Sequence, residues 1–165
     1  MQLQIEMYLR IPYKARFMKK PKKKSKLQKR IDDSNSRLWR NKADKLWKQL
    51  ISLRGEGKCA ICGSKEWVQA HHLIPREMIS HRHCAQNGIL LCASHHKYSF
   101  ELSPHKAPVA FFKWIMKKDP GRWDWLLKQE PSRDNGCVDF KNTVTDLDIY
   151  LVKSYPPKVN VYPGS

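Results

Sequence analysis

The sequence predicts an α+β fold in which two short strands and a helix form a small metal-stabilised core, with further helices on either side. Three observations lead to this prediction. Cysteines and histidines cluster between Cys59 and His96, two short apolar runs lie within that stretch, and segments with helical spacing flank it. Ligand pairs of this kind are typical of a zinc module, which needs little apolar core of its own. The 165 residues suffice for one domain plus extensions, and we expect a basic flexible arm at 1–31, the domain at 32–130 and a C-terminal extension at 131–165.

Charge is the strongest feature of the composition. The chain has 32 Lys and Arg against 15 Asp and Glu, which gives a formal charge of +17. Such a charge attracts polyanions and accelerates encounters with them, although a basic surface that serves only solubility has the same composition. Cysteines beside histidines, without the apolar core of a signal peptide, predict metal binding in a reducing compartment, hence a cytoplasmic location. No apolar run is long enough to span a bilayer, so no membrane partner is expected.

The arm at 1–31 is expected to stay disordered until it binds a polyanion, because its cations repel one another. The residues of this arm that we expect to bind nucleic acid are Lys22, Lys23 and Lys24.

Helical spacing begins after the arm. Apolar residues recur from Ser36 to Arg54 so that they form one stripe on a helix. Ser34 or Ser36 is suited to cap its start and Gly55 to end it. We expect this stripe to pack on the metal module, with its tryptophans in the core and not on a base-stacking surface.

The central stretch predicts strands at Trp67–Leu73 and Gly88–Cys92, with Ser94 capping a helix that starts at His95 or His96. Pro108 suits the first turn of a further helix, and Pro120-Gly121 separates it from the next one. Beyond Pro131 the pattern weakens, and Val144–Val152 fits a strand or a helix.

Four residues have the spacing of a closed structural zinc site. Cys59-x-x-Cys62 and Cys92-x-x-His95 are two ligand pairs from two turns, and Gly63 permits the tight first turn. Zinc binding at such a site contributes roughly 10–16 kcal/mol in isolated modules. A competing assignment places Cys84 or His83 in the position of His95. Cys137 stands apart and is expected to be a plain thiol.

A second set of imidazoles is interleaved with the first. Adjacent strand residues point to opposite faces, so His71 and His72 are expected to have different tasks, one on a metal and one facing a substrate. Adjacent helical residues diverge by about 100°, so His95 can face the zinc while His96 faces the strands. A neutral imidazole is a suitable base for phosphodiester hydrolysis, and one divalent cation can stabilise the leaving oxygen. Asn87 would either orient the base or bind the metal.

These residues carry a family resemblance. The stretches Trp67-Val-Gln-Ala-His71-His72-Leu-Ile-Pro75-Arg76 and Asn87-Gly-Ile-Leu-Leu-Cys92-Ala-Ser-His95-His96 resemble the HNH endonucleases with their ββα-metal fold. The chain looks most similar to phage-encoded members, including those grouped with phage recombination functions. The resemblance extends from about Leu38 to Trp125.

The resemblance implies an enzyme that cleaves DNA with a divalent metal, Mg²⁺ or Mn²⁺, beside a structural Zn²⁺. By it, His71 and His96 bind the catalytic metal, His72 is the general base and Asn87 is the central Asn. A phage origin would place the protein in the host cytoplasm. The chain departs from the usual pattern at two positions. The fourth zinc ligand is His95 where Cys is commoner, and Phe100 stands where many members have a further metal-binding His. His105, Glu101 or water would fill that position.

Other basic residues near the motif have more than one interpretation. Arg76 would either contact the scissile phosphate or form a surface salt bridge. For the loop residues His81, Arg82 and His83, phosphate contact or surface charge explains their presence as well as metal ligation does.

The main alternative function is a non-catalytic zinc-containing protein that binds nucleic acid. A zinc-dependent deaminase is excluded, because its His-x-Glu and Pro-Cys-x-x-Cys motifs are missing. No small-molecule cofactor is expected, and no repeat indicates an oligomeric state.

Overall fold

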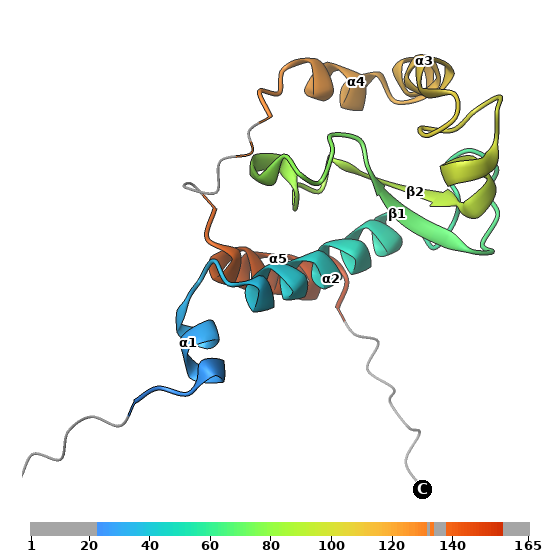
Figure 1. Cartoon of the computed structure of the whole chain (residues 1–165). Coiled ribbons are helices and arrows are strands. Elements are labelled where there is room, and N and C mark those ends of the chain that lie inside the picture. The colour runs from blue at the N-terminus through green and yellow to red at the C-terminus, as the bar shows by residue number, and fades with distance from the viewer. Residues whose placement is uncertain (1–22, 132, 134–137, 157–165) are drawn as a thin grey trace, which may run out of the picture.

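A two-stranded sheet lies between two layers of helices in this computed structural model, which describes residues 23–131, 133 and 138–156 (Figure 1). The strands are β1 (Val68–His72) and β2 (Gly88–Cys92). On one side lie α2 (Arg37–Arg54) and α5 (Phe140–Ser154), and on the other lie α3 (Pro108–Lys118) and α4 (Pro120–Leu127). The expected mixture of helices and a small antiparallel sheet is confirmed, and a cluster of cysteines and a histidine that could hold zinc accompanies it.

The register of the two strands places the histidines. They pair antiparallel, with His71 opposite Ile89 and His72 opposite Gly88. Every residue of β2 is buried, because both faces of the strand are covered. Leu90 belongs to the apolar cluster of α2 and α5, and Leu91 packs with Phe111 of α3. The sheet therefore has two different sides, and neighbouring residues of β1 face different layers.

Helix α2 fulfils the prediction made from its apolar stripe. Trp47 is 1% exposed and lies in the core, as expected. The cap differs from expectation, because the Ser36 side chain makes no hydrogen bond to the first turn of α2. Its hydroxyl donates instead to the carbonyl oxygen of Arg30, 2.6 Å away. Ser36 thereby joins α2 to the helix before it.

The sheet and α2 are in direct contact at Gly88. A Cβ atom on this residue would lie 2.2 Å from Cδ1 of Ile51 and 2.8 Å from Cζ2 of Trp47. Glycine is thus required here by close approach of the helix, and the motif Asn87-Gly88 has a packing role as well as a turn role.

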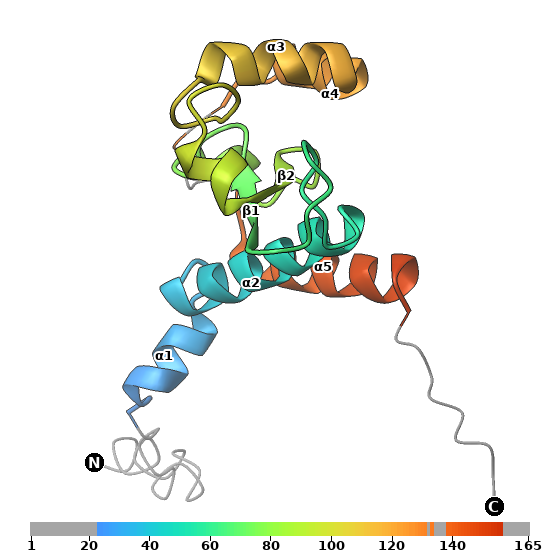
Figure 2. The same cartoon turned by 90° about the vertical axis from the view of Figure 1, so that its right-hand side faces the viewer.

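Two segments are more ordered than the sequence suggested. The end of the arm forms a short helix, α1 (Lys26–Asp32), whose first turn is capped by the hydroxyl of Ser25. The structure thus gives the end of the arm a helical conformation, and the expected flexibility of the arm stays a prediction. Lys23 and Lys24 are exposed, and Lys24 forms an ion pair with Asp32. The ambiguous segment after Pro131 is helical as α5, which Figure 2 shows alongside α2.

Some expectations concern residues outside the described part, namely the arm up to Lys22 and the thiol of Cys137. Among the described helices, none has both the length and the apolar character needed to cross a bilayer.

Candidate active site

The four expected zinc ligands come together at one end of the sheet. Cys59 and Cys62 belong to the turn after α2, where Gly63 has φ of 74°, whereas Cys92 ends β2. His95 lies in η3 (Ser94–Tyr98), a π-helical turn in which the Ser99 N–H donates to the Ser94 carbonyl. Ser94 is therefore inside this turn, and the prediction that it caps a helix is wrong. All four ligand atoms lie within 4.8 Å of one another.

The spacing of these atoms fits a tetrahedral zinc ion. A Zn–S bond of about 2.3 Å and a Zn–N bond of about 2.0 Å place neighbouring sulfurs about 3.8 Å apart, and a sulfur and a nitrogen about 3.5 Å apart. Sγ of Cys62 and Sγ of Cys92 are separated by 3.8 Å. Nδ1 of His95 is 3.8 Å from Sγ of Cys59 and 3.3 Å from Sγ of Cys92. The donor set therefore suits a structural zinc ion.

The backbone supports this cluster as well. Burial would raise the pKa of the Cys59 thiol, but three backbone N–H groups lower it overall, which favours the thiolate that a metal requires. Ala60 N–H donates to the Leu90 carbonyl, which ties the first turn to β2. The two competing ligands lie elsewhere, because His83 contacts Asp44 and Cys84 contacts Gln86.

A second cluster consists of His71, His96 and His105. Their ligand nitrogens also lie within 4.8 Å of one another, and Nδ1 of His71 is 3.1 Å from Nε2 of His96. Two nitrogens bound at about 2.1 Å in adjacent octahedral positions of one ion lie about 3.0 Å apart. The geometry thus fits a shared divalent cation. Of the two side chains considered for the third position, His105 belongs to this cluster and Glu101 does not. Phe100, which stands where many family members have a His, is 79% exposed to solvent.

Burial favours the neutral form of two rings of this cluster, His71 and His96, and metal ligation requires that form. Burial lowers the pKa of His71 to about 3, with further lowering by the nearby His96, His105 and His72. Burial also lowers the pKa of His96, and His105 and Lys97 add to this effect.

Gln69 is a part of the site that the sequence analysis missed. Its Oε1 lies 3.2 Å from Nδ1 of His96, so an N–H at Nδ1 would donate to it and leave Nε2 free for a metal. The alternation of β1 was the available signal, because Gln69 and His71 are two residues apart and share a face.

His72 faces the opposite side of β1 from His71. Its ring stacks on Trp47 of α2, with centroids 3.8 Å apart and an interplanar angle of 10°. Its Nε2–H donates to the carbonyl oxygen of Arg82 at 2.9 Å, so Nδ1 is the unprotonated nitrogen. Burial lowers the pKa of His72 to about 4, although that carbonyl opposes the shift. His72, His71 and His105 line a single pocket of about 360 Å³.

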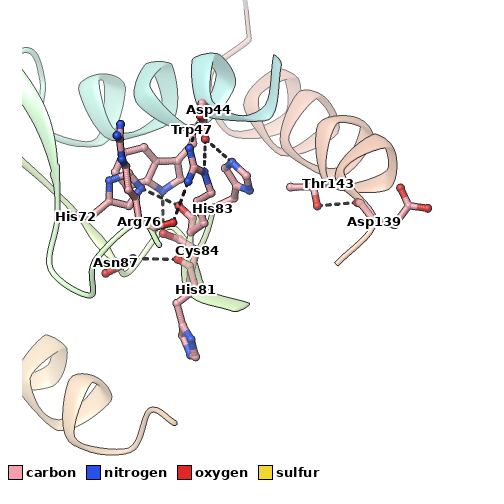
Figure 3. A network of polar contacts seen from close by, with 11 residues as sticks. Asp44, Trp47, His72, Arg76, His81, His83, Cys84, Asn87, Asp139 and Thr143 are labelled. Carbon is pink, nitrogen blue, oxygen red and sulfur yellow. Dashed lines mark hydrogen bonds and ion pairs between the residues drawn. The ribbon is translucent and has the colours of Figure 1, made fainter. Parts of the chain in front are cut away.

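Asn87 has neither of the contacts expected for it. The side chain is fully buried, and its Oδ1 accepts a hydrogen bond from the Ile74 N–H at 2.6 Å. Its Nδ2 donates to the carbonyl oxygens of Ile74 and His81. The amide therefore bonds to the backbone of the loop between the strands, and it holds the ends of that loop together (Figure 3).

The basic loop residues are mostly internal. Arg82 forms a two-point ion pair with Asp44, and His83 contacts the same carboxylate, so neither fits the expected phosphate contact or surface charge. His81 contacts the side chain of Gln129. Arg76 is exposed, lines the site pocket and pairs with Glu77, which agrees with the salt-bridge alternative.

Comparison with known families agrees with this arrangement, since residues 59–99 match the HNH endonuclease family. This segment is an HNH domain. No curated protein and no solved structure matches the chain. The HNH domain contains the four zinc ligands together with His71, His72 and His96, whereas His105 and the whole of α2 lie outside the matched residues. The family is one of nucleases, which generally act on nucleic acids.

Proposed function

We propose that this protein is a metal-dependent endonuclease that hydrolyses phosphodiester bonds of DNA. The observation that carries the proposal is the shared pocket, which is lined by two members of the three-histidine cluster, His71 and His105, and by the neutral, oriented imidazole of His72. A zinc module that only binds nucleic acid needs neither. The excess of basic residues and the match to the HNH endonucleases support DNA as the substrate.

In this proposal His71, His96 and His105 hold a divalent cation, Mg²⁺ or Mn²⁺. When bound, such a cation neutralises charge on the phosphate and stabilises the leaving oxygen. Cys59, Cys62, Cys92 and His95 hold a structural Zn²⁺ that connects the first turn, β2 and η3. The thiolate-rich set agrees with zinc, and the three-histidine set leaves open positions in which water and phosphate oxygens would complete the coordination of a divalent cation.

His72 acts as the general base. A water oxygen attacks phosphorus while its proton passes to Nδ1 of His72, and the bond from phosphorus to the leaving oxygen breaks. The Arg82 carbonyl oxygen accepts a hydrogen bond from Nε2–H of His72, so Nδ1 of the same ring remains free to accept the proton of the water. We expect three exposed cations to contact phosphates: Arg76, which lines the pocket, and Lys23 and Lys24, which precede α1. The exposed ion pairs of Arg76 and Lys24 are weak enough to exchange for such contacts. Asn87 acts indirectly, through the loop.

Plasmid cleavage tests this proposal. Supercoiled plasmid is incubated with the zinc-loaded protein and Mg²⁺, Mn²⁺ or EDTA, and nicked and linear products are quantified. We expect cleavage with either cation and none with EDTA. His72→Ala should lower the rate by at least about 100-fold while zinc content and DNA affinity stay unchanged. His81→Ala, which removes a loop imidazole outside both clusters, is the matched control. If His72→Ala cuts as fast as the parent protein, His72 is not the base.

A further inference from the structure

Helix α2 reaches the site from outside the HNH domain. Its Asp44 accepts two hydrogen bonds from Arg82, Nε to Oδ1 and Nη2 to Oδ2, each 2.7 Å long. The side chains are 24% and 12% exposed, so this pair is largely shielded from solvent. His83 adds a third contact to the same carboxylate at 2.8 Å (Figure 3).

Arg82, which pairs with Asp44 through its side chain, also contacts His72 through its backbone. The Arg82 carbonyl oxygen receives the Nε2–H of His72, and Nη1 of Arg82 donates to the Arg76 carbonyl at 2.9 Å. The side chain of Arg82 therefore connects two parts of the irregular loop between the strands, and its backbone carbonyl contacts His72. Strand pairing does not define the position of this carbonyl, because Arg82 lies outside β1 and β2.

The two contacts of the His72 ring restrain different motions. Stacking on Trp47 defines the plane of the imidazole but is compatible with two ring orientations, which differ by a flip of roughly 180° about the Cβ–Cγ bond. The hydrogen bond to the Arg82 carbonyl defines the in-plane orientation and selects the Nε2–H tautomer. Loss of this acceptor would let either nitrogen carry the proton, and only one of the two tautomers presents Nδ1 as a base.

A two-point pair between a guanidinium and a carboxylate has essentially one geometry, which makes it suitable for holding a backbone segment in place. Burial alone would raise the pKa of Asp44, but the hydrogen bonds from Arg82 and His83 hold it well below its usual range. The carboxylate is thus charged at neutral pH.

We propose that Asp44 is a positioning residue for His72, because it holds Arg82 where its carbonyl fixes the tautomer and the in-plane orientation of the imidazole. The proposal rests on the proposed role of His72 as the base. It also implies that the HNH domain is completed by a residue of α2, a helix that precedes the segment matched by the family.

Two readouts test this role. The first is the tautomer of His72, read from a long-range ¹H–¹⁵N spectrum of the zinc-loaded full chain with ¹⁵N-labelled histidine, and assigned with His72→Ala. The second is plasmid cleavage, with kcat and KM separated. For Asp44→Asn we expect a mixture of His72 tautomers and a fall in kcat of about 10- to 100-fold, with little change in KM. Asp146→Asn, which neutralises an exposed carboxylate on α5, should match the parent protein in both readouts.

A second variant keeps the test valid if Asp44→Asn does not fold. In the double variant Asp44→Leu with Arg82→Met, an apolar pair replaces the ion pair, an exchange that proteins often tolerate without loss of stability. We expect this protein to fold, to retain zinc and still to show mixed tautomers and a reduced kcat.

The outcomes separate this inference from the proposed function. A single Nε2–H tautomer and an unchanged kcat in either variant would overturn the role of Asp44, even if the parent protein cleaves DNA. If the parent protein cleaves nothing, the nuclease proposal fails, and the tautomer spectrum alone then decides whether Asp44 positions His72.

Discussion

Replacing Gly88 with alanine should destabilise the protein strongly, because α2 rests directly on this residue. The added Cβ would lie 2.2 Å from Cδ1 and 2.4 Å from Cγ1 of Ile51, and 2.8 Å from Cζ2 of Trp47. Carbon atoms normally approach to about 3.5–4.0 Å, so the overlap with Ile51 exceeds about 1 Å. Ile51 and Trp47 are 2% and 1% exposed, so both side chains are held by other core residues around them.

Overpacking of a filled core typically costs 1–3 kcal/mol, and an overlap of this size with two large side chains should place Gly88→Ala at about 3 kcal/mol. Equilibrium unfolding in urea, followed by tryptophan fluorescence with zinc present in excess, measures this change. Gly121→Ala is the matched control, because a Cβ at that position meets nothing within 4 Å and the residue lies in helix α4. We expect it to be neutral or to stabilise by up to about 1 kcal/mol.

A double variant isolates the contact. Ile51→Ala alone should cost about 2–5 kcal/mol, but together with Gly88→Ala it should cost less than the sum of the two single changes, since the new methyl group occupies the space of the lost side chain. Additive costs, or a Gly88→Ala protein within about 0.5 kcal/mol of the parent, would refute the reasoning.

Three further predictions concern the metal site and the loop. Gln69→Leu should weaken Mn²⁺ binding, measured by titration calorimetry, by about 10- to 100-fold, while Gln69→Glu should retain it because a carboxylate also accepts from Nδ1 of His96. Equal affinity of the two variants would contradict this role. His105→Ala should lower Mn²⁺ affinity, whereas Phe100→Ala should leave it unchanged, and the reverse result would assign the third ligand elsewhere. Because the folded-state pKa of Asp44 is depressed, its stabilising effect is complete above its unfolded-state pKa of about 3.9 and is lost as the pH falls toward the lower folded-state value. The difference in unfolding free energy between the parent protein and Asp44→Asn should therefore narrow below about pH 4, and a constant difference would exclude this linkage.

Local patterns in the sequence predicted most of the elements and both ligand groups. The paired spacing of Cys59, Cys62, Cys92 and His95 indicated one closed site, and the structure brings all four together. The alternation of a strand placed His71 and His72 on different faces, as observed. The stripe on α2 and the prolines of α3 and α4 located those helices, since spacing and backbone restriction act within one element.

Contacts between distant segments were not predictable in the same way. Asn87 was expected at the base or the metal, yet its amide bonds to the loop backbone. Arg82 was expected at phosphate or on the surface, yet it pairs with Asp44, a residue of α2 that is 38 positions away. The sequence left several groups open as the third candidate ligand, and the structure brings the His105 ring to 5.3 Å from the His71 ring of β1, centroid to centroid.

The sequence by itself determined which atoms are available for metals and which face of each element they occupy, because side-chain chemistry and the periods of helix and strand are local properties. The packing of the α2 stripe on the metal module was expected, but only the tertiary structure decided which side of the sheet α2 covers, so that Trp47 stacks on His72 and Asp44 reaches Arg82. The reason is physical: which polar groups become partners depends on how buried apolar faces pack together, and that packing is a property of the whole chain.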